Sequence, residues 1–260
     1  MGGLVLAGIT GIVVIGGLKR IAEVATFLVP LMGSIYFGAM LVALIINLNQ
    51  VLPAFKLIFI DAFNGTAIAG GTFFGVLIYG VRRGAFSNEA GMGTESLVHG
   101  VAKVSNPVKQ GLVAMTGPIF DTLIICTATA LMILVSGVWE TSSSQGVTLT
   151  AEAFSILLGS FGGLILFVCV ICFGLSTIFT YSYYGASCSR FLFGKFGMKF
   201  YIYLYILSIF IYSIVPIDIA INIADGAFAM MAIPTLISAL WLAPKVMQAS
   251  KIYFKLVDNN

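Results

Sequence analysis

Long apolar runs dominate this sequence and restrict the folds open to it. Several of them approach or exceed the roughly 20 residues that a helix needs to cross the hydrocarbon core of a bilayer. Apolar residues make up 60% of the chain and charged residues only 9%, which is too few charges to cover a soluble domain of this length. We therefore predict an all-helical integral membrane protein. The predicted spans are Leu4–Leu18, Ile21–Leu48, Phe63–Val81, Leu112–Val138, Phe154–Tyr184, Tyr201–Val215 and Ile217–Leu242.

The first run is short for a membrane span and begins close to Met1. It has neither the charged n-region nor the small-residue cleavage site of a signal peptide. We interpret it as the end of a helix whose beginning is missing.

Basic residues are distributed unevenly between the loops that join these runs. Lys56 lies on one side of the predicted membrane, where the loops also carry acidic residues, and the other twelve of the thirteen lysines and arginines lie on the opposite side. The positive-inside bias then predicts a multi-pass protein of the cytoplasmic (inner) membrane with a cytoplasmic C-terminus. The net charge of +3 reflects this loop bias, and we predict no nucleic-acid partner.

Motifs of soluble enzymes are absent from the sequence. Cys169-x-x-Cys172 has a spacing that metal sites use, but it lies within an apolar run, where cysteines act as small apolar residues. His99 is the only histidine, so a nucleophile–base pair at membrane depth is hard to build. We predict a protein that is not an enzyme and that has no organic cofactor.

Glycines are unusually frequent in the run Phe63–Val81 and just after it. They are Gly65, Gly70, Gly71, Gly75, Gly80 and Gly84. Glycine lowers helix stability by about 1 kcal/mol, so the run needs a reason to contain them. Either the pairs Gly71-x3-Gly75 and Gly80-x3-Gly84 are helix-packing faces, or the helix is broken and its backbone groups bind substrate and ions.

Hydroxyl and thiol groups recur at helical spacing in the run Phe154–Tyr184 and beyond it. The residues on this face are Cys169, Cys172, Ser176, Thr180, Tyr184 and Ser187, with Thr177 and Tyr181 on the adjacent strip. The hydroxyls either bond to carbonyls of their own helix or line a wet seam whose oxygens bind a hard cation such as sodium.

A second polar group lies in the run Leu112–Val138. Asp121 follows a kink predicted at Pro118, and three threonines come after it. An ionisable residue at this depth is either functional or a structural group held by neighbouring hydroxyls. Upstream, Asn106-Pro107 predicts an ordinary helix start.

The polar stretch RRGAFSNEAGMGTES, from Arg82 to Ser96, carries a family resemblance. Arg83-Gly84, Phe86–Gly91 and Gly93 match the RGxFSNEAGxG signature of the alanine or glycine:cation symporter family. The segments HGVAKVSNPVKQGLV, FDTLIICTATALMIL, STIFTYSYYG and AIPTLI resemble that family in the same order. The resemblance extends over essentially the whole chain.

This resemblance implies a LeuT-type bundle of two inverted five-helix repeats within a single membrane domain, residues 1–260. On that mapping, residues 1–18 end helix four and residues 21–48 form helix five. Residues 62–243 form the complete second repeat, helices six to ten, and residues 244–260 form a cytoplasmic tail. The N-terminal half would be missing, so we expect the chain to be part of a longer parent. The alternatives are that a separate chain supplies the missing half, or that this is a truncated half-transporter with no activity alone.

The resemblance also implies sodium-coupled symport of a small neutral amino acid, alanine or glycine, with sodium as the coupling ion. Ser176 and Thr177 are then the expected sodium ligands. Substrate would contact Gly70, Gly71, Phe74 and Gly75, together with Thr177 and Tyr181.

The polar stretch is expected to form an inner gate or a structural clamp at the cytoplasmic end of helix six. Its members would be Arg83, Ser87, Asn88 and Glu89, with Arg82 or Arg83 paired to Glu89 or Glu95 and with Ser87 or Asn88 capping a short helix. The sequence departs from the family pattern at Thr94–Ser96, Tyr181, Ala186 and Thr235, and these departures bear on substrate choice.

Overall fold

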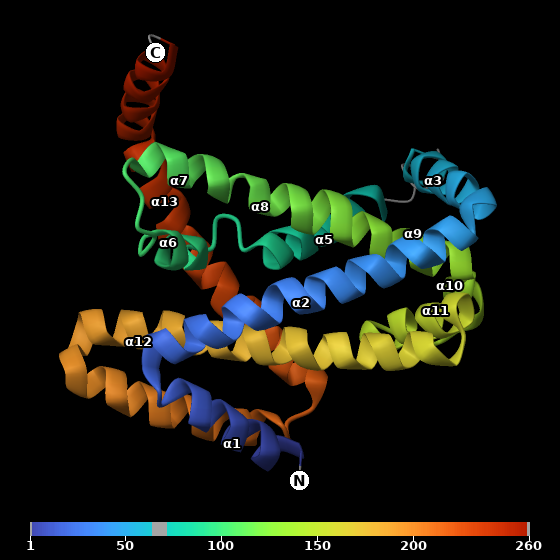
Figure 1. Cartoon of the computed structure of the whole chain (residues 1–260), viewed down its shortest axis with the longest axis horizontal. Coiled ribbons are helices and arrows are strands. Elements are labelled where there is room, and N and C mark those ends of the chain that lie inside the picture. The colour runs from blue at the N-terminus through green and yellow to red at the C-terminus, as the bar shows by residue number, and fades with distance from the viewer. Residues whose placement is uncertain (1, 64–71, 259–260) are drawn as a thin grey trace. The chain divides into compact units, whose positions relative to one another are not determined.

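A computed structural model describes residues 2–63 and 72–258 (Figure 1). Every regular element in these two ranges is helical. The first seven are α1 (Gly2–Val14), α2 (Gly17–Ile46), α3 (Leu48–Ala62), α5 (Thr72–Asn88), α6 (Thr94–His99), α7 (Pro107–Ala114) and α8 (Thr116–Pro118). They are followed by the π-helix η1 (Ile119–Cys126), α9 (Thr127–Ser136), α10 (Val138–Thr141), α11 (Val147–Leu158), α12 (Ser160–Tyr212) and α13 (Ile217–Asp258).

Four helical stretches are long and apolar enough to cross a bilayer: Arg20–Ile46, Pro107–Ser136, Ser160–Tyr212 and Ile217–Asp258. Two shorter apolar helices, Gly2–Val14 and Val147–Leu158, accompany them. The prediction of an all-helical, multi-pass membrane protein is therefore confirmed.

Glycines set two chain reversals, of which one lies in the loop predicted between Tyr184 and Tyr201 and the other lies inside a predicted span. Gly159 has φ 69° and ψ −159° and separates α11 from α12, so the predicted span Phe154–Tyr184 was wrong at its start. Gly194 adopts φ 70° and ψ −159° inside α12, and Figure 1 shows this helix turning back on itself. A backbone with positive φ is readily available to glycine alone.

The reversal at Gly194 carries both aromatic and basic side chains. Phe191 is 90% exposed and Phe196 is 82% exposed, with Arg190 and Lys195 close by in sequence. Aromatic rings beside lysine and arginine are typical of the level at which lipid headgroups meet hydrocarbon. The turn between the two arms of α12 therefore has the composition of a membrane interface.

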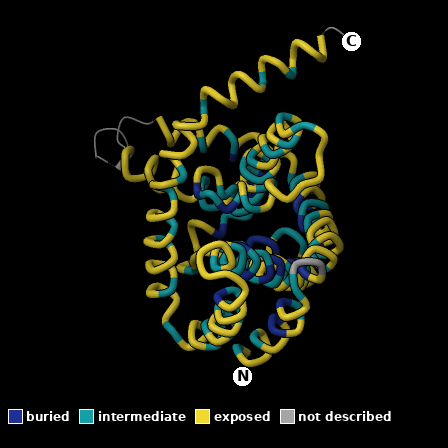
Figure 2. Tube along the Cα trace, turned by 90° about the vertical axis from the view of Figure 1, so that its left-hand side faces the viewer, coloured by how far each residue is buried: buried dark blue, intermediate teal, exposed yellow. Residues whose placement is uncertain are grey.

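The described helices form two compact units. The first unit comprises Met1–Ile78 and Ile124–Ser213, and its main core joins α2, α9, α11 and α12. The core residues are Tyr36, Met40, Ala43, Ala128, Met132, Phe154, Leu166 and Cys169. Buried positions are sparse along the helices, as the dark blue segments of Figure 2 show, which leaves large apolar surfaces for lipid.

The two arms of α12 pack closely within this unit. The hydroxyl of Tyr205 donates a 2.8 Å hydrogen bond to the backbone carbonyl of Ile178. A Cβ atom added at Gly185 would overlap the ring of Tyr201. Glycine at this position therefore allows the ring to lie directly against the backbone of the other arm.

The second unit comprises Tyr79–Leu123 and Ile214–Asn260. It brings the end of α5, the helices α6 and α7 and the long helix α13 together. Phe86 of α5 and Phe228 of α13 pack edge to face, with ring centroids 5.0 Å apart. This unit contains the whole polar stretch from Arg82 to Ser96.

Candidate functional site

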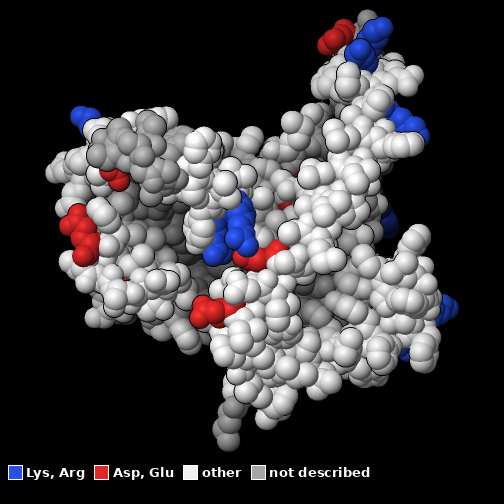
Figure 3. Space-filling model, turned by 180° about the vertical axis from the view of Figure 1, so that it is seen from behind, with Lys and Arg blue, Asp and Glu red and all other residues white. Residues whose placement is uncertain are grey.

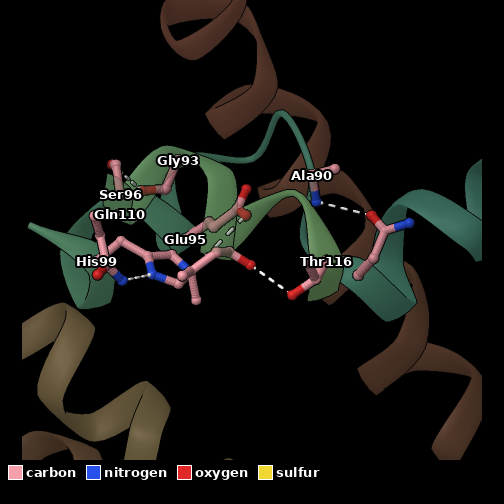
Figure 4. Close-up of polar contacts among 9 residues, drawn as sticks. Ala90, Gly93, Glu95, Ser96, His99, Gln110 and Thr116 are labelled. Carbon is pink, nitrogen blue, oxygen red and sulfur yellow. Dashed lines mark hydrogen bonds and ion pairs between the residues drawn. The ribbon is translucent and has the colours of Figure 1, made fainter. Parts of the chain in front are cut away.

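The middle of the polar stretch is a tight turn with three left-handed residues. Glu89 has φ 56°, Gly91 has φ 81° and Gly93 has φ 87°. The side-chain oxygen of Asn88 accepts a 2.9 Å hydrogen bond from the backbone N–H of Ala90, which closes the first part of the turn (Figure 4). The density of glycine in the motif therefore follows from backbone handedness.

This turn lies directly against α13. A Cβ atom at Gly93 would come within 2.6 Å of Oγ1 of Thr235, and one at Gly91 would lie 3.8 Å from Leu236. The neighbouring Thr94 is only 1% exposed, and its hydroxyl has no hydrogen-bond partner in the structure as described. The side chain of Thr235 therefore leaves little room for a side chain at Gly93, whereas at Gly91 the positive φ favours glycine.

The end of α5 is tied to η1 by side-chain hydrogen bonds. The hydroxyl of Ser87 donates to Oδ2 of Asp121 over 2.5 Å, and Nδ2 of Asn88 donates to Oγ1 of Thr122 over 3.2 Å. Asp121 lies near the middle of the candidate span Pro107–Ser136. Two groups of candidate residues that the sequence placed separately thus meet in one site.

At Pro118, where a kink was predicted, α8 ends and the π-helix η1 begins at the next residue. Proline cannot donate an intrahelical hydrogen bond and it crowds the preceding turn. Short π-helical segments widen a helix locally and are frequent at functional sites. Asp121 and Thr122 both lie on this widened segment.

The arginines pair differently from the expected clamp. Arg82 forms an ion pair of 2.6 Å with Asp225 of α13. The guanidinium of Arg83 lies 5.0 Å from the centre of the Tyr79 ring, at cation–π distance. Glu95 lies 4.0 Å from Nε2 of His99, whose ring also contacts Gln110 (Figure 4).

The expected cap by Ser87 or Asn88 was also wrong. The residue at the N-cap of α6 is Gly93, and Asn88 bonds within its own turn. The predicted helix start at Asn106-Pro107 is confirmed, because the Asn106 side chain accepts a 2.9 Å hydrogen bond from the N–H of Val108.

The expected sodium ligands lie on adjacent positions of α12, within the first unit. Ser176 is buried at 6% exposure, donates to the carbonyl of Phe173 at 2.9 Å and lies 3.9 Å from Sδ of Met32. Thr177 is exposed. A hydroxyl that donates to a carbonyl keeps lone pairs for a cation, but a thioether is a soft neighbour for a hard ion.

Other hydroxyls on α12 bond to their own helix. Thr180 donates to the carbonyl of Ser176 over 2.9 Å, and Ser182 donates to the carbonyl of Phe179 over 2.6 Å. This is the pattern of the packing alternative. The ring of Tyr181 lies 5.3 Å from that of Tyr184, and it shares its side of the helix with Thr177, four residues earlier.

The expected substrate contacts on α5 are described only in part, because Gly70 and Gly71 fall outside the described residues. Phe74 is 68% exposed. A Cβ atom added at Gly75, Gly80 or Gly84 would meet no atom within 4 Å. Within the described ranges, these glycines therefore have no closely packed neighbour of the kind that a packing face needs.

Two polar residues of the spans were missed by sequence reasoning. Asp225 lies inside the run Ile217–Leu242. An ionisable residue within a membrane span is a candidate functional residue, and this was the signal that could have identified it. Tyr36 lies in α2, where its hydroxyl is 2.9 Å from that of Thr129. A tyrosine inside an otherwise apolar span was the available signal, because a buried phenol needs a partner.

Comparison with known proteins identifies the family of this chain. The sequence profile of the sodium:alanine symporter family, a family of transporters, matches residues 1–260. The sodium/alanine symporter AgcS of Methanococcus maripaludis is 36% identical over 99% of this chain and 57% of its own length.

Two further relatives come from Bacillus subtilis. The uncharacterized transporter YflA is 38% identical over 94% of this chain and 53% of its own length. The probable sodium/glutamine symporter GlnT is 34% identical over 96% of this chain and 53% of its own length. The chain spans about half the length of the curated relatives that it matches. It belongs to the sodium:alanine symporter family.

Proposed function

We propose that this chain takes part in sodium-coupled symport of a small neutral amino acid, alanine or glycine, across the cytoplasmic membrane. The observation that carries the proposal is the match of the family profile along residues 1–260. Relatives named as sodium/alanine and sodium/glutamine symporters support sodium coupling and an amino-acid substrate.

The proposed architecture is a LeuT-type bundle with a cytoplasmic C-terminus, in which residues 21–48 are helix five and residues 62–243 the second repeat. Irregular helices support it, because transporters of this kind bind their substrates where helices are interrupted. The described chain has such an irregular segment at η1.

Thr177 is the proposed sodium ligand that remains most accessible. Thr177 is an exposed residue beside the buried Ser176, and neutral oxygens suit a hard cation. Tyr181, one turn further along α12, would contact the amino acid together with Gly70, Gly71, Phe74 and Gly75.

The inner gate would use the tie between α5 and η1. Ser87 and Asn88 fasten the end of α5 to Asp121 and Thr122, while Arg82 fastens it to Asp225. Glu89 and Arg83 flank these ties. A movement of α5 during transport then either breaks these contacts or carries η1 and α13 with it.

Uptake of labelled alanine and glycine into proteoliposomes, driven by a sodium gradient, tests the function. One preparation contains this chain, and a second contains a chimera in which the chain replaces the matching part of AgcS. Uptake by the chimera alone indicates that the chain needs the rest of a transporter. A folded chimera that takes up neither amino acid contradicts the proposed function.

Thr177→Val tests the ion site in whichever preparation transports. We expect a higher sodium concentration for half-maximal uptake, because one oxygen ligand is lost. Thr180→Val is the matched control, since its hydroxyl is already bonded to the carbonyl of Ser176. An unchanged sodium dependence in well-folded Thr177→Val shows that Thr177 is not a ligand.

A further inference from the structure

The C-terminal part of α13, residues 244–258, is an amphipathic helix with a basic face. Its polar stripe recurs every three or four residues and consists of Lys245, Gln248, Lys251, Lys255 and Asp258. Lys251 and Lys255 share a face because they are four residues apart, and both line one shallow pocket together with Gln248, Ser250, Ile252, Phe254 and Asp258. Figure 3 shows the basic side chains at this end of α13.

Apolar side chains occupy the opposite side of the same segment. Val246, Tyr253 and Val257 follow one another at spacings of seven and four residues, which places them on one helical face. Val246 is 62% exposed and Val257 is 51% exposed. In the described part of the chain, α13 contacts α5 and the turn before α6 well upstream of this segment, at Asp225, Phe228, Thr235 and Leu236.

The length of α13 places this segment outside the hydrocarbon. The helix has 42 residues, which extend over about 63 Å at 1.5 Å per residue. The hydrocarbon core is only about 30 Å thick, and the predicted span Ile217–Leu242 already crosses it with some tilt. Residues beyond Pro244 must therefore lie in the headgroup region or in water.

Pro244 is a natural point for a change of direction. Proline removes one intrahelical hydrogen bond and weakens the preceding turn, and sharp bends in long helices usually occur at proline. A bend here would lay the amphipathic segment along the membrane surface, with its apolar face toward the acyl chains.

We propose that residues 244–258 form a surface helix that binds anionic phospholipid headgroups of the bilayer that the chain spans. Charge complementarity favours this partner, because the segment carries three lysines and one aspartate. A basic amphipathic helix with exposed apolar residues has the composition of an interfacial membrane anchor. Each lysine near such a surface favours the attached state about fivefold.

The attachment is electrostatic in part, so its strength should depend on the salt concentration and on the anionic lipid content of the bilayer. Three lysines together favour attachment by about 100-fold. Counterions screen charges at the bilayer surface over about 10 Å at 0.1 M salt and about 3 Å at 1 M. Attachment should therefore weaken with salt and with loss of anionic lipid.

A tryptophan reporter in the intact chain measures the attachment. Trp139 and Trp241 are replaced by phenylalanine, and Tyr253→Trp supplies a reporter on the apolar face of the segment. The protein is placed in bilayers of phosphatidylcholine with or without phosphatidylglycerol, and quenching by lipids brominated on their acyl chains is recorded. We expect quenching and blue-shifted emission in the anionic bilayer, with both effects reduced in pure phosphatidylcholine and at 1 M salt.

Charge variants separate lipid binding from simple apolar insertion. Lys245→Gln, Lys251→Gln and Lys255→Gln combined should abolish the dependence on anionic lipid, whereas the three Lys→Arg changes should preserve it. A chain that keeps Trp241 as its only tryptophan reports insertion of the membrane span. Its quenching should change neither with the three Lys→Gln changes nor with the three Lys→Arg changes. Equal quenching with and without anionic lipid, or quenching unchanged by the three glutamines, overturns the proposal. A reporter that stays in water in every bilayer also overturns it, and would direct the search to a protein partner.

Discussion

The hydroxyl of Ser87 donates a 2.5 Å hydrogen bond to a carboxyl oxygen of Asp121. The two residues are 34 positions apart in sequence, and the bond joins the end of α5 to the π-helical segment η1. Thr122, next to Asp121, accepts from Asn88 at 3.2 Å. Two successive residues of one helix therefore hold two successive residues of the other.

We predict that Ser87→Ala destabilises the protein by about 1 kcal/mol, because it removes the donor of the shortest of these bonds. Asp121→Asn retains an acceptor oxygen and should have a smaller effect than Asp121→Ala. Unfolding free energies in detergent for the single and double alanine variants form a double-mutant cycle. A coupling energy close to zero would show that the hydrogen bond contributes nothing to stability.

Gly93→Ala should destabilise the protein by about 1–2 kcal/mol. The left-handed backbone at φ 87° disfavours a Cβ atom by that amount, and Thr235 lies within 2.6 Å of its position. The melting temperature of Gly93→Ala is compared with that of Gly80→Ala, where the added methyl group meets no atom within 4 Å. Equal changes in melting temperature for both substitutions would contradict an origin in the left-handed backbone and the contact with Thr235. Adding Thr235→Ala to Gly93→Ala should restore only the stability lost through that contact.

Gly185→Ala should separate the two arms of α12. The new methyl group overlaps the ring of Tyr201, and overpacking of this kind typically costs about 1–3 kcal/mol. Gly174→Ala is the matched control on the same helix, because no atom lies within 4 Å of the added group. Thermal unfolding distinguishes the two variants, and a Gly185→Ala protein as stable as the control would refute the close packing.

Tyr36→Phe tests a hydrogen bond in the core of the first unit. The substitution removes the 2.9 Å contact with the hydroxyl of Thr129 but keeps the ring, which stacks on Phe154 with centroids 5.6 Å apart. We expect a loss of about 0.5–1 kcal/mol. Phe154→Ala, which empties a fully buried site, should cost about 3–5 kcal/mol. If unfolding experiments show that Tyr36→Phe destabilises the protein more than Phe154→Ala, the hydrogen bond between Tyr36 and Thr129 contributes more to stability than the buried ring does.

Glu152 gives stability a dependence on acid pH. Hydrogen bonds from Ser142 and from Ser144 lower the pKa of this carboxyl group, and the bond from Ser144 is 2.6 Å long. The stabilisation is present above the ordinary glutamate pKa of about 4.3 and is lost as the pH falls through the lower pKa of the folded state. Titration by carbon NMR should show the pKa rising in Ser142→Ala, and an unchanged value would contradict the assignment.

Local signals in the sequence predicted the helices better than their connections. Apolar runs identified the long helices, and Asn106-Pro107 and Pro118 marked a helix start and an irregularity. Gly159 was not recognised as a reversal, because the residues on both sides of it are equally apolar, whereas Gly194 lies in the loop predicted between Tyr184 and Tyr201. A hydropathy pattern carries no information about the sign of φ.

The candidate site depended on contacts between distant residues. Glycine, serine and asparagine in the stretch from Arg82 to Ser96 predicted a polar, bendable segment, but not that Ser87 would bond to Asp121. Arg82 had several acidic residues as possible partners, and its pairing with Asp225 depends on how α5 packs on α13. Such choices are made by tertiary packing, which no local pattern contains.

The π-helix η1 has a consequence for changes in chain length. A π-helix bonds each N–H five residues back, whereas an α-helix bonds four residues back, so η1 accommodates surplus residues without forming a loop. Deleting one residue between Ile119 and Cys126 would let the segment return to α-helical bonding, whereas the same deletion in a regular α-helix would turn one flanking part by about 100° about the axis. This segment can therefore lose one residue with less change in the orientation of the flanking helices than a regular α-helix would show.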